Sequence, residues 1–395
     1  MKIYEIGTGY TPIPAQMGAA TEIVVEELAN AFLELKENVV VVDISSSYRE
    51  KTNFLIEEIK MPAVFNRLDV SLGLIHKIKR VVYSILLALK IRSLIKKSSE
   101  KTILHFHNQY NMFFYLKIIP EKMRKKVLTA YTVHSYIWGT DWDKIEKTIK
   151  NRYFQEIECV KNADAVLVLN EITSNHFVEK LGVDSNRIFK IINGVSLKKY
   201  RPLPVDTISQ FKAEIGFENK KIIFQVGSVC ERKNQLGSVE MLAEYLKSHK
   251  DVVYIYAGGI IDSDYQNAII KYASENGIEK QVVYVGELSP GKVLNQYYNI
   301  ADCSVFTSKL ESFGLVIIEA IASGTPVVVG SKPLFDLKNG YTIFNSKDEF
   351  IDQIDLCLKK IVHSDYDRTE VLDKYNWTSV AKEHLNVFNS IQERQ

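Results

Sequence analysis

The chain has 395 residues, of which 46% are hydrophobic and 25% charged, a composition typical of a soluble globular protein with two or three domains. Its formal net charge of +2 gives no general case for binding nucleic acid, so any basic surface must be local. The four cysteines are widely spaced and form no zinc-binding pattern, which favours reduced, buried thiols in a cytoplasmic protein. The chain starts directly with a strand pattern and has no window of about 18 uncharged apolar residues, so we expect neither a signal peptide nor a membrane-spanning helix.

Strands and helices alternate along the first half of the chain, which predicts a parallel sheet covered by helices. The segments with strand character are 2–6, 39–43, 103–107, 127–133, 165–169 and 187–191. Helical periodicity lies between them, for instance over residues 21–35 and 171–181.

A local basic region lies within this first half. No acidic residue occurs from Val70 to Ser99, while seven lysine and arginine residues accompany many aliphatic ones. Five aliphatic residues share one helical face: Leu74, Ile78, Val81, Ile85 and Leu89. A basic amphipathic helix over 74–97 can lie on an anionic membrane surface, where each cation contributes about 1 kcal/mol. An ordinary domain helix with a solvated basic face explains the same pattern, and the sequence leaves both interpretations open.

The strand–helix alternation restarts after a charged connector near residue 200. Further strands are predicted at 222–226, 252–257, 282–285, 303–307 and 326–329, and the last segment, 377–395, has a helical pattern. We therefore predict an α/β protein with two Rossmann-like parallel-sheet domains, over residues 1–200 and 201–376.

The most informative segment runs from Lys309 to Pro326. It separates Glu311 from Glu319 by seven residues, and Glu319 falls inside an apolar run with helical spacing. Gly324 and Pro326 end this predicted helix, and a strand follows at once. An unpaired carboxylate packed against a sheet costs several kcal/mol, on the order of 2–7, so Glu319 needs a polar partner, and a ligand hydroxyl would serve.

The start of the same helix predicts an anion site. Ser312, Phe313 and Gly314 lead into it, and free backbone N–H groups at a helix N-terminus bind anions. An anion site beside a buried hydroxyl acceptor suits a nucleoside diphosphate with its ribose. The alternative is an ordinary amphipathic helix with one partly exposed glutamate.

A second phosphate-binding candidate follows the first strand of the second half. Gly227 stands at the strand end, where a glycine lets backbone approach a ligand, and Arg232 and Lys233 stand at the next helix start. Their charges suit the neutralisation of a leaving diphosphate. A solvated basic pair is the alternative, but the combination with Glu311 and Glu319 favours the ligand interpretation.

Taken together, these segments resemble retaining glycosyltransferases of the GT4 type, which have the GT-B fold of two Rossmann-like domains. The Glu-x7-Glu motif with its following Pro-Val-Val carries the resemblance. Two further matches extend it over most of the chain, namely residues 163–170 and the Asn193-Gly194 segment before the connector. Two departures stand out: Ser228 replaces an arginine common in relatives, and the loop between Gly330 and Gly340 is shortened. The resemblance implies that the helix 377–395 crosses back onto the first domain.

The resemblance also implies roles for individual residues. The donor-binding positions are Gly18, Gly227, Arg232, Lys233, Glu311, Phe313, Gly314, Leu315 and Glu319. The catalytic positions are His134, Arg232, Lys233 and Glu311. By this resemblance Glu319 contacts the ribose and Glu311 the sugar hydroxyls, while Arg232 and Lys233 stabilise the departing diphosphate.

The first domain would contribute the acceptor side and part of the reaction centre. His134 matches the family's Thr-x-His at a strand end, where it would face the donor sugar. Gly18 matches the glycine loop before the first helix, although Gly18-Ala19 replaces the usual double glycine. His105 and His107 alternate on the preceding strand and lie on one face, and either is alternatively a core histidine with its hydrogen bonds satisfied.

No cofactor or metal ion is predicted. Two Asp-x-Asp triplets, at 141–143 and 262–264, precede helices, where aspartate caps, so we expect capping and metal-independent transfer. The expected partners are a nucleotide sugar, with a UDP-sugar favoured because it is commonest, and a glycan or lipid-linked acceptor of cell-surface polysaccharide synthesis. We expect a cytoplasmic protein, peripheral on the inner membrane face if the basic helix binds lipid. A catalytically silent sugar-binding subunit and a sugar-nucleotide epimerase are the alternatives.

Overall fold

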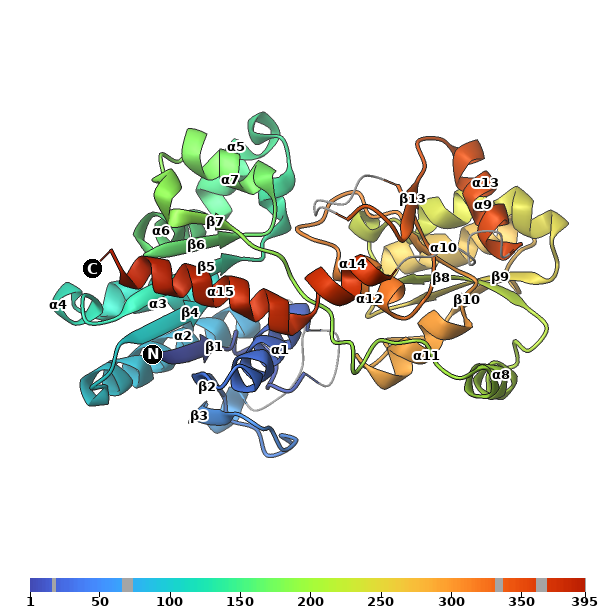
Figure 1. Ribbon diagram of the computed structural model, residues 1–395. Helices are drawn as coiled ribbons and strands as arrows, with labels where there is room; N and C mark the ends of the chain where they lie inside the picture. The colour runs from blue at the N-terminus through green and yellow to red at the C-terminus, as the bar shows by residue number, and fades with distance from the viewer. Residues whose placement is uncertain (16–18, 66–73, 331–336, 360–367, 395) are drawn as a thin grey trace. The chain divides into compact units, whose positions relative to one another are not determined.

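The computed structural model describes residues 1–15, 19–65, 74–330, 337–359 and 368–394. The chain divides into two units (Figure 1): unit 1 comprises residues 1–193 and 377–395, and unit 2 comprises residues 194–376. The first crossing, between Asn193 and Gly194, comes slightly before the expected boundary at residue 200. The second lies between Asn376 and Trp377, so the terminal helix belongs to unit 1.

Unit 1 is built on a seven-stranded parallel sheet in the order β3-β2-β1-β4-β5-β6-β7. Its strands are β1 (Lys2–Ile6), β2 (Asn38–Ile44), β3 (Leu55–Ile59), β4 (Thr102–Phe106), β5 (Leu128–Val133), β6 (Ala165–Val168) and β7 (Ile188–Lys190). The strand order reverses at β1, whose neighbours are β2 and β4. Sheets of this kind bind ligands at the carboxyl ends of the strands beside such a switch point.

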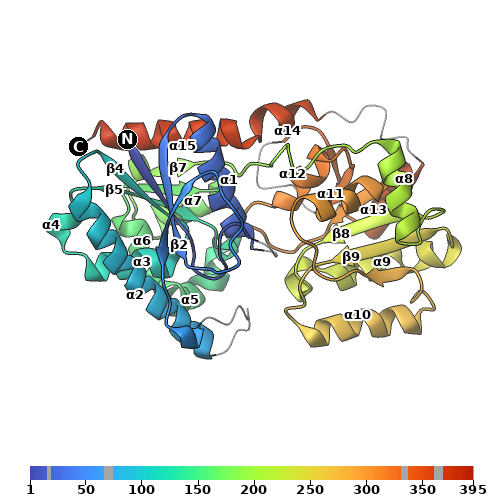
Figure 2. The same cartoon turned by 90° about the horizontal axis from the view of Figure 1, so that it is seen from below.

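Helices cover both faces of this sheet (Figures 1 and 2). The helices of unit 1 are α1 (Ala20–Glu34), α2 (Leu74–Lys97), α3 (Gln109–Ile118), α4 (Glu121–Arg124), α5 (Trp142–Arg152), α6 (Phe154–Asn162), α7 (Glu171–Glu179) and α15 (Trp377–Gln392), with 3-10 turns η1 (Ala63–Phe65), η2 (Tyr136–Gly139) and η3 (Ser185–Arg187). On one face α1 packs against α15, with the rings of Phe32 and Phe388 6.1 Å apart. On the other, Tyr83 of α2 and Tyr115 of α3 join a core that includes Tyr4 of β1.

Unit 2 has a six-stranded parallel sheet in the order β10-β9-β8-β11-β12-β13. The strands are β8 (Lys221–Val226), β9 (Val252–Ala257), β10 (Val282–Tyr284), β11 (Cys303–Phe306), β12 (Val327–Val329) and β13 (Tyr341–Ile343). The helices are α8 (Val205–Glu214), α9 (Gln235–Ser248), α10 (Ser263–Glu275), α11 (Lys292–Ile300), α12 (Leu315–Ala322), α13 (Lys347–Leu358) and α14 (Thr369–Lys374), with the 3-10 turn η4 (Glu231–Lys233).

The predicted fold class is confirmed, because both units are parallel sheets flanked by helices. The predicted strands occur with small shifts at their ends, and β1 and β9 match residue for residue. Sequence analysis missed β3 and β13, and both lie at sheet edges. An edge strand has one free side and tolerates charge, so β3, with the sequence Leu-Ile-Glu-Glu-Ile, has no buried-strand pattern.

Two further expectations concern the cysteines and the hydropathy of the helices. All four cysteines are free, with Cys159, Cys303 and Cys357 buried and Cys230 half-buried. In the part of the chain that the structure describes, no helix combines the length and hydropathy needed to cross a membrane.

Candidate active site

At the carboxyl edge of the sheet in unit 2, two glycines allow neighbouring parts of the chain to approach each other closely. Gly227 follows β8 with φ of +150°, and a Cβ there would lie 3.2 Å from two carbons of the Lys233 side chain. Gly258 follows β9, and a Cβ there would lie 2.1 Å from the carbonyl oxygen of Gly227. The predicted position of Gly227 at a strand end is confirmed, and only glycine lets the chain and Lys233 pass so closely.

Three of the predicted donor-site residues form one cluster. A single oxygen of Glu311, Oε1, lies 2.8 Å from Nη1 of Arg232 and 2.6 Å from Nζ of Lys233. Arg232 also donates to the carbonyl oxygen of Leu310 at 3.0 Å, which ties η4 to the segment before α12. The three side chains are 14–27% exposed, so the cluster remains open to a ligand. The two cations lie on a 3-10 turn rather than at the start of the helix, since α9 begins at Gln235.

The helix α12 begins and ends close to the predicted positions. Gly314 is its N-cap with φ of +101°, a left-handed conformation that glycine adopts without strain, and Phe313 before it is buried. Leu315 is the first helical residue, so its backbone N–H is one of those without an acceptor inside the helix. Gly324 closes the other end with φ of +86°.

Glu319 lies on the buried side of α12 and is 9% exposed. Its Oε2 accepts a hydrogen bond from the hydroxyl of Tyr298 on α11 at 3.2 Å. The need for a polar partner is therefore met in part by the protein itself. Sequence reasoning missed Tyr298, because a contact between two helices separated in the chain leaves no local pattern.

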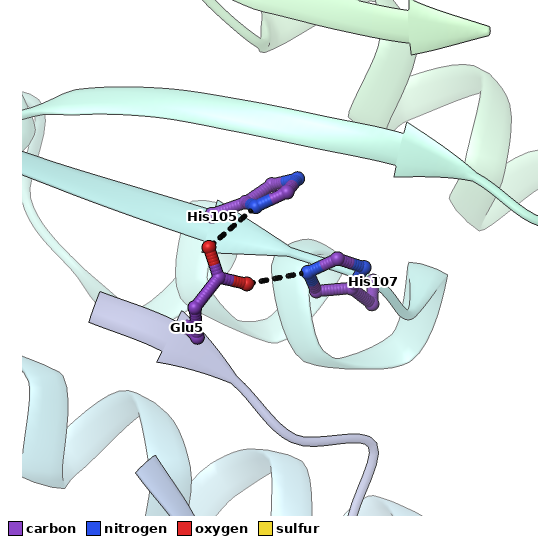
Figure 3. A group of neighbouring side chains, drawn as sticks. All are labelled: Glu5, His105 and His107. Atoms are coloured by element: carbon purple, nitrogen blue, oxygen red, sulfur yellow. Dashed lines mark hydrogen bonds and ion pairs between the residues drawn. The ribbon is translucent and has the colours of Figure 1, made fainter. Parts of the chain in front are cut away.

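In unit 1, the predicted residue His134 is half-buried and belongs to a hydrogen-bonded group whose other members are buried. His134 follows β5, and its Nε2 lies 3.0 Å from Nδ1 of His107. The other ring nitrogen of His107 lies 2.7 Å from Oε2 of Glu5, whose Oε1 lies 2.8 Å from Nδ1 of His105 (Figure 3). The expectation that His105 and His107 share one face is confirmed, because both reach the same carboxylate on β1. Glu5, which sequence reasoning missed, joins them as a fully buried carboxylate on β1.

Burial and hydrogen bonding set the charges in this group. Burial raises the pKa of Glu5, but attraction to His105 and hydrogen bonds from His105 and His107 outweigh it and hold the pKa at about 2. Burial lowers the pKa of His107 to about 4 and lowers that of His105. It also holds the pKa of His134 well below its ordinary value. At neutral pH one carboxylate therefore faces neutral imidazoles.

The same three side chains have the geometry of a candidate metal site. One ligand atom from each of Glu5, His105 and His107 lies within 4.8 Å of the others. Each of those atoms already takes part in a hydrogen bond of 2.7–2.8 Å. These hydrogen bonds alone therefore explain why the three side chains lie so close together.

Two other predictions concern the Asp-x-Asp triplets and the glycine loop. Helix capping by both triplets is confirmed: Asp141 accepts from the backbone N–H of Asp143 and Asp262 from that of Tyr265. Gly18 lies outside the described residues.

Two family models match the chain. The model described as Glycosyltransferase Family 4 covers residues 21–199, and the one described as Glycosyl transferases group 1 covers residues 207–364. The chain belongs to the GT4-type glycosyltransferases that these two models describe. The two models meet near the crossing between the units, and each matches one parallel-sheet unit of the GT-B fold.

Curated relatives of this glycosyltransferase match mostly over part of their length. An uncharacterised glycosyltransferase of Methanocaldococcus jannaschii is 28% identical over 46% of this chain and 48% of its own. The D-inositol 3-phosphate glycosyltransferase of Nocardia farcinica is 32% identical over 45% of this chain and 40% of its own. These alignments span about half or less of the two relatives, whereas spore coat protein SA of Bacillus subtilis is 22% identical over 98% of this chain and 99% of its own.

Solved structures show the same fold over nearly the whole chain. The Anabaena protein HepE, crystallised with UDP and glucose, superposes with a TM-score of 0.74 at 14% identity, covering 98% of this chain and 99% of its own. Sucrose-phosphate synthase from Thermosynechococcus elongatus gives a TM-score of 0.75 at 17% identity, covering 100% of both chains. At these identities the likeness concerns the fold.

Proposed function

We propose that this glycosyltransferase is a retaining, metal-independent enzyme that moves a hexose from a nucleoside diphosphate donor to a glycan or lipid-linked sugar. The observation that carries the proposal is the cluster of Arg232, Lys233 and Glu311 beside the chain segment that enters α12. Two cations held by one carboxylate are pre-positioned to stabilise the negative charge that develops on a departing diphosphate. Such fixed electrostatic stabilisation is usually the largest single contribution to catalysis.

The donor would be anchored at both ends by unit 2. The amides at the start of α12 suit the diphosphate, and Glu319 suits a ribose hydroxyl alongside its bond from Tyr298. Glu311 would contact the sugar, and His134 of unit 1 would contact it near the reacting carbon. A UDP-sugar is the favoured donor, and HepE, a protein of the same fold, has been crystallised with UDP-glucose.

A cavity in unit 1 supports an acceptor that carries negative charge. It has a volume of about 320 Å³ and lies beyond the ends of β1, β2 and β3. Lys60 and Lys79 line it together with hydroxyls, including those of Ser45, Ser47 and Tyr10, and none of the described residues that line it is acidic. Lys79 is only 8% exposed and burial lowers its pKa, so a bound phosphate would favour its charged form. This composition suits a phosphate-linked acceptor better than a neutral glycan.

The surface of α2 supports a membrane-held acceptor. The core side of α2 carries Tyr83, Leu87 and Ile91, all buried, whereas Ile78 and Leu89 on the predicted apolar face are each 47% exposed. The helix therefore has a second apolar face outside the core, next to the exposed cations of the basic region. We propose that this face lies on an anionic bilayer. Liposome flotation should show binding that needs anionic lipid and is lost in Ile78→Asp. Equal flotation of the unmodified protein and of Ile78→Asp would contradict the proposal that this face binds the bilayer.

A thermal-shift panel of UDP, GDP, ADP and CMP with their common sugar conjugates tests the donor proposal. Selective stabilisation by one nucleoside diphosphate supports the glycosyltransferase and names its donor class. Conversion of the selected donor without an acceptor would instead indicate an epimerase, and no shift from any of them would indicate a silent subunit. Transfer that EDTA abolishes and magnesium or manganese restores would contradict metal independence.

A further inference from the structure

The carboxylate of Glu5 determines where the protons lie on its two neighbours. It is fully buried, and its two oxygens face Nδ1 of His105 and Nε2 of His107 (Figure 3). An ionised carboxylate only accepts hydrogen bonds, so both facing nitrogens must carry a proton. The low pKa of Glu5 agrees with this ionised state.

The protons on these two nitrogens determine the state of the other nitrogen in each ring, and so the hydrogen bonds to Thr132 and His134. A neutral imidazole has one protonated nitrogen, so the other nitrogen of each ring is an acceptor. Nε2 of His105 can accept from the hydroxyl of Thr132, which lies 2.7 Å away. Nδ1 of His107 faces Nε2 of His134 at 3.0 Å, and this contact is a hydrogen bond only if His134 supplies the proton.

We propose that Glu5 and His107 are positioning residues that hold His134 as the Nε2–H tautomer and leave its Nδ1 an acceptor. Glu5, His105 and His107 are buried, whereas His134 is half-buried. His134 is therefore the member of this hydrogen-bonded group that reaches the surface. Among the described residues, Nδ1 of His134 has no hydrogen-bond partner. A substrate hydroxyl would donate to it, which is the catalytic consequence and rests on the proposed function.

The opposite placement of protons on His107 and His134 would be recognisable in the tautomer of His134. If Glu5 carried a proton, or if His107 were an imidazolium, Nδ1–H of His107 would donate to Nε2 of His134. A neutral His134 would then present Nδ1–H, a donor, to its substrate. The two arrangements therefore differ in the protonated nitrogen of one residue, and this difference is measurable without any substrate.

Long-range proton–nitrogen correlation spectra of the 395-residue chain, labelled with nitrogen-15 at its eight histidines, test the assignment. Such spectra distinguish a protonated from a bare ring nitrogen. The proposal predicts Nδ1–H for His105 and Nε2–H for both His107 and His134 at neutral pH. Nδ1–H on His134, or protons on both nitrogens of His107, would overturn it. The ligand-free spectrum is decisive even if the protein transfers no sugar, so failure of the proposed function is recognised separately.

A pair of variants tests the positioning role. His107→Phe removes the acceptor for His134, and we expect a mixture of His134 tautomers and a loss of turnover of about tenfold or more, the usual cost of removing a partner that orients a histidine. Thr132→Val removes a hydrogen bond of the same buried network on the His105 branch and should leave the His134 tautomer and turnover unchanged. Unchanged turnover and tautomer in His107→Phe, or equal losses in both variants, would refute the role. If His107→Phe does not fold, the spectrum of the unmodified protein still decides the assignment.

Discussion

Arg232 and Glu311 form an ion pair of 2.8 Å between the turn after β8 and the segment before α12. The same carboxylate oxygen holds Lys233, so the pair fixes both cations at once. Glu311 therefore has a structural role before any donor binds, in addition to the sugar contact that the family resemblance implies. This shared contact makes the electrostatic contribution of each cation testable.

Replacement of Arg232 by alanine should lower kcat by about 100-fold, because one fixed charge that stabilises the leaving diphosphate is lost. Lys309→Ala is the matched control: this lysine is close in sequence to Glu311 but pairs with the exposed Glu231 at 3.0 Å. Steady-state transfer assays should show near-normal kcat in the control. Wild-type kcat in Arg232→Ala would show that the ion pair is only structural.

Replacement of Glu319 by alanine should raise the donor KM by about tenfold or more, since a hydrogen bond to a charged group contributes on the order of 1.5–3 kcal/mol. Tyr298→Phe removes one protein donor to the same carboxylate, together with a hydrogen bond to the carbonyl oxygen of Val316, and leaves the ribose contact possible. Donor titrations should therefore separate the two variants. An equal rise of KM in both would indicate that Glu319 serves packing between α11 and α12 rather than the donor.

Substitution of Gly227 by alanine should destabilise the protein and weaken donor binding together. The backbone φ of +150° strains any side chain, by about 1–3 kcal/mol, and the new methyl group would press on Lys233. Gly286→Ala is the control, because its φ is +82° but a Cβ there would meet nothing within 4 Å. Both variants should lose stability in urea unfolding, and only Gly227→Ala should lose donor affinity beyond that. Normal donor affinity in Gly227→Ala would separate this glycine from the donor site.

Glu22 on α1 should make stability depend on pH. Burial raises its pKa from 4.5 to about 7, against the opposing effect of a hydrogen bond from Thr8. Because the folded pKa is the higher one, the folded state binds the proton more tightly. The stabilisation is complete below about pH 4.5 and is lost as the pH rises through about 7, a change on the order of 3 kcal/mol.

Urea unfolding of Glu22→Gln across this pH range should therefore show a flatter profile than the unmodified protein. Glu50→Gln, an exposed position in the same unit, provides the control and should keep the original profile. Identical profiles for all three proteins would mean that Glu22 is not the titrating group.

The sequence predicted the local features of the site well. Gly227 lies at the end of β8 and Glu311 lies just before α12, as the strand ends and the Glu-x7-Glu spacing indicated, because these signals depend on residues close together in the chain. Arg232 and Lys233 follow β8 as expected, but they lie on η4 rather than at the start of a helix. The shared use of one Glu311 oxygen by both cations was not predictable, since it joins segments separated by the whole of β9 to β11. Tyr298 and Glu5 were missed for the same reason, as their partners come from other elements.

The apolar faces of α2 illustrate a different limit. Spacing alone identified the face of Ile78 and Leu89, but it did not reveal that the core uses another face, with Tyr83 and Leu87. A helix rich in aliphatic residues all around fits several orientations equally well. Only the packing against α3 and the sheet decides among them.

Calorimetric titration of UDP and UMP, or of the corresponding pair for the base that the thermal-shift panel selects, shows whether Arg232 and Lys233 bind the diphosphate. We expect the diphosphate to bind at least about tenfold more tightly than the monophosphate, and Arg232→Gln to remove most of this difference while leaving monophosphate binding unchanged. Equal affinities in the unmodified protein, or an unchanged difference in Arg232→Gln, would contradict this expectation.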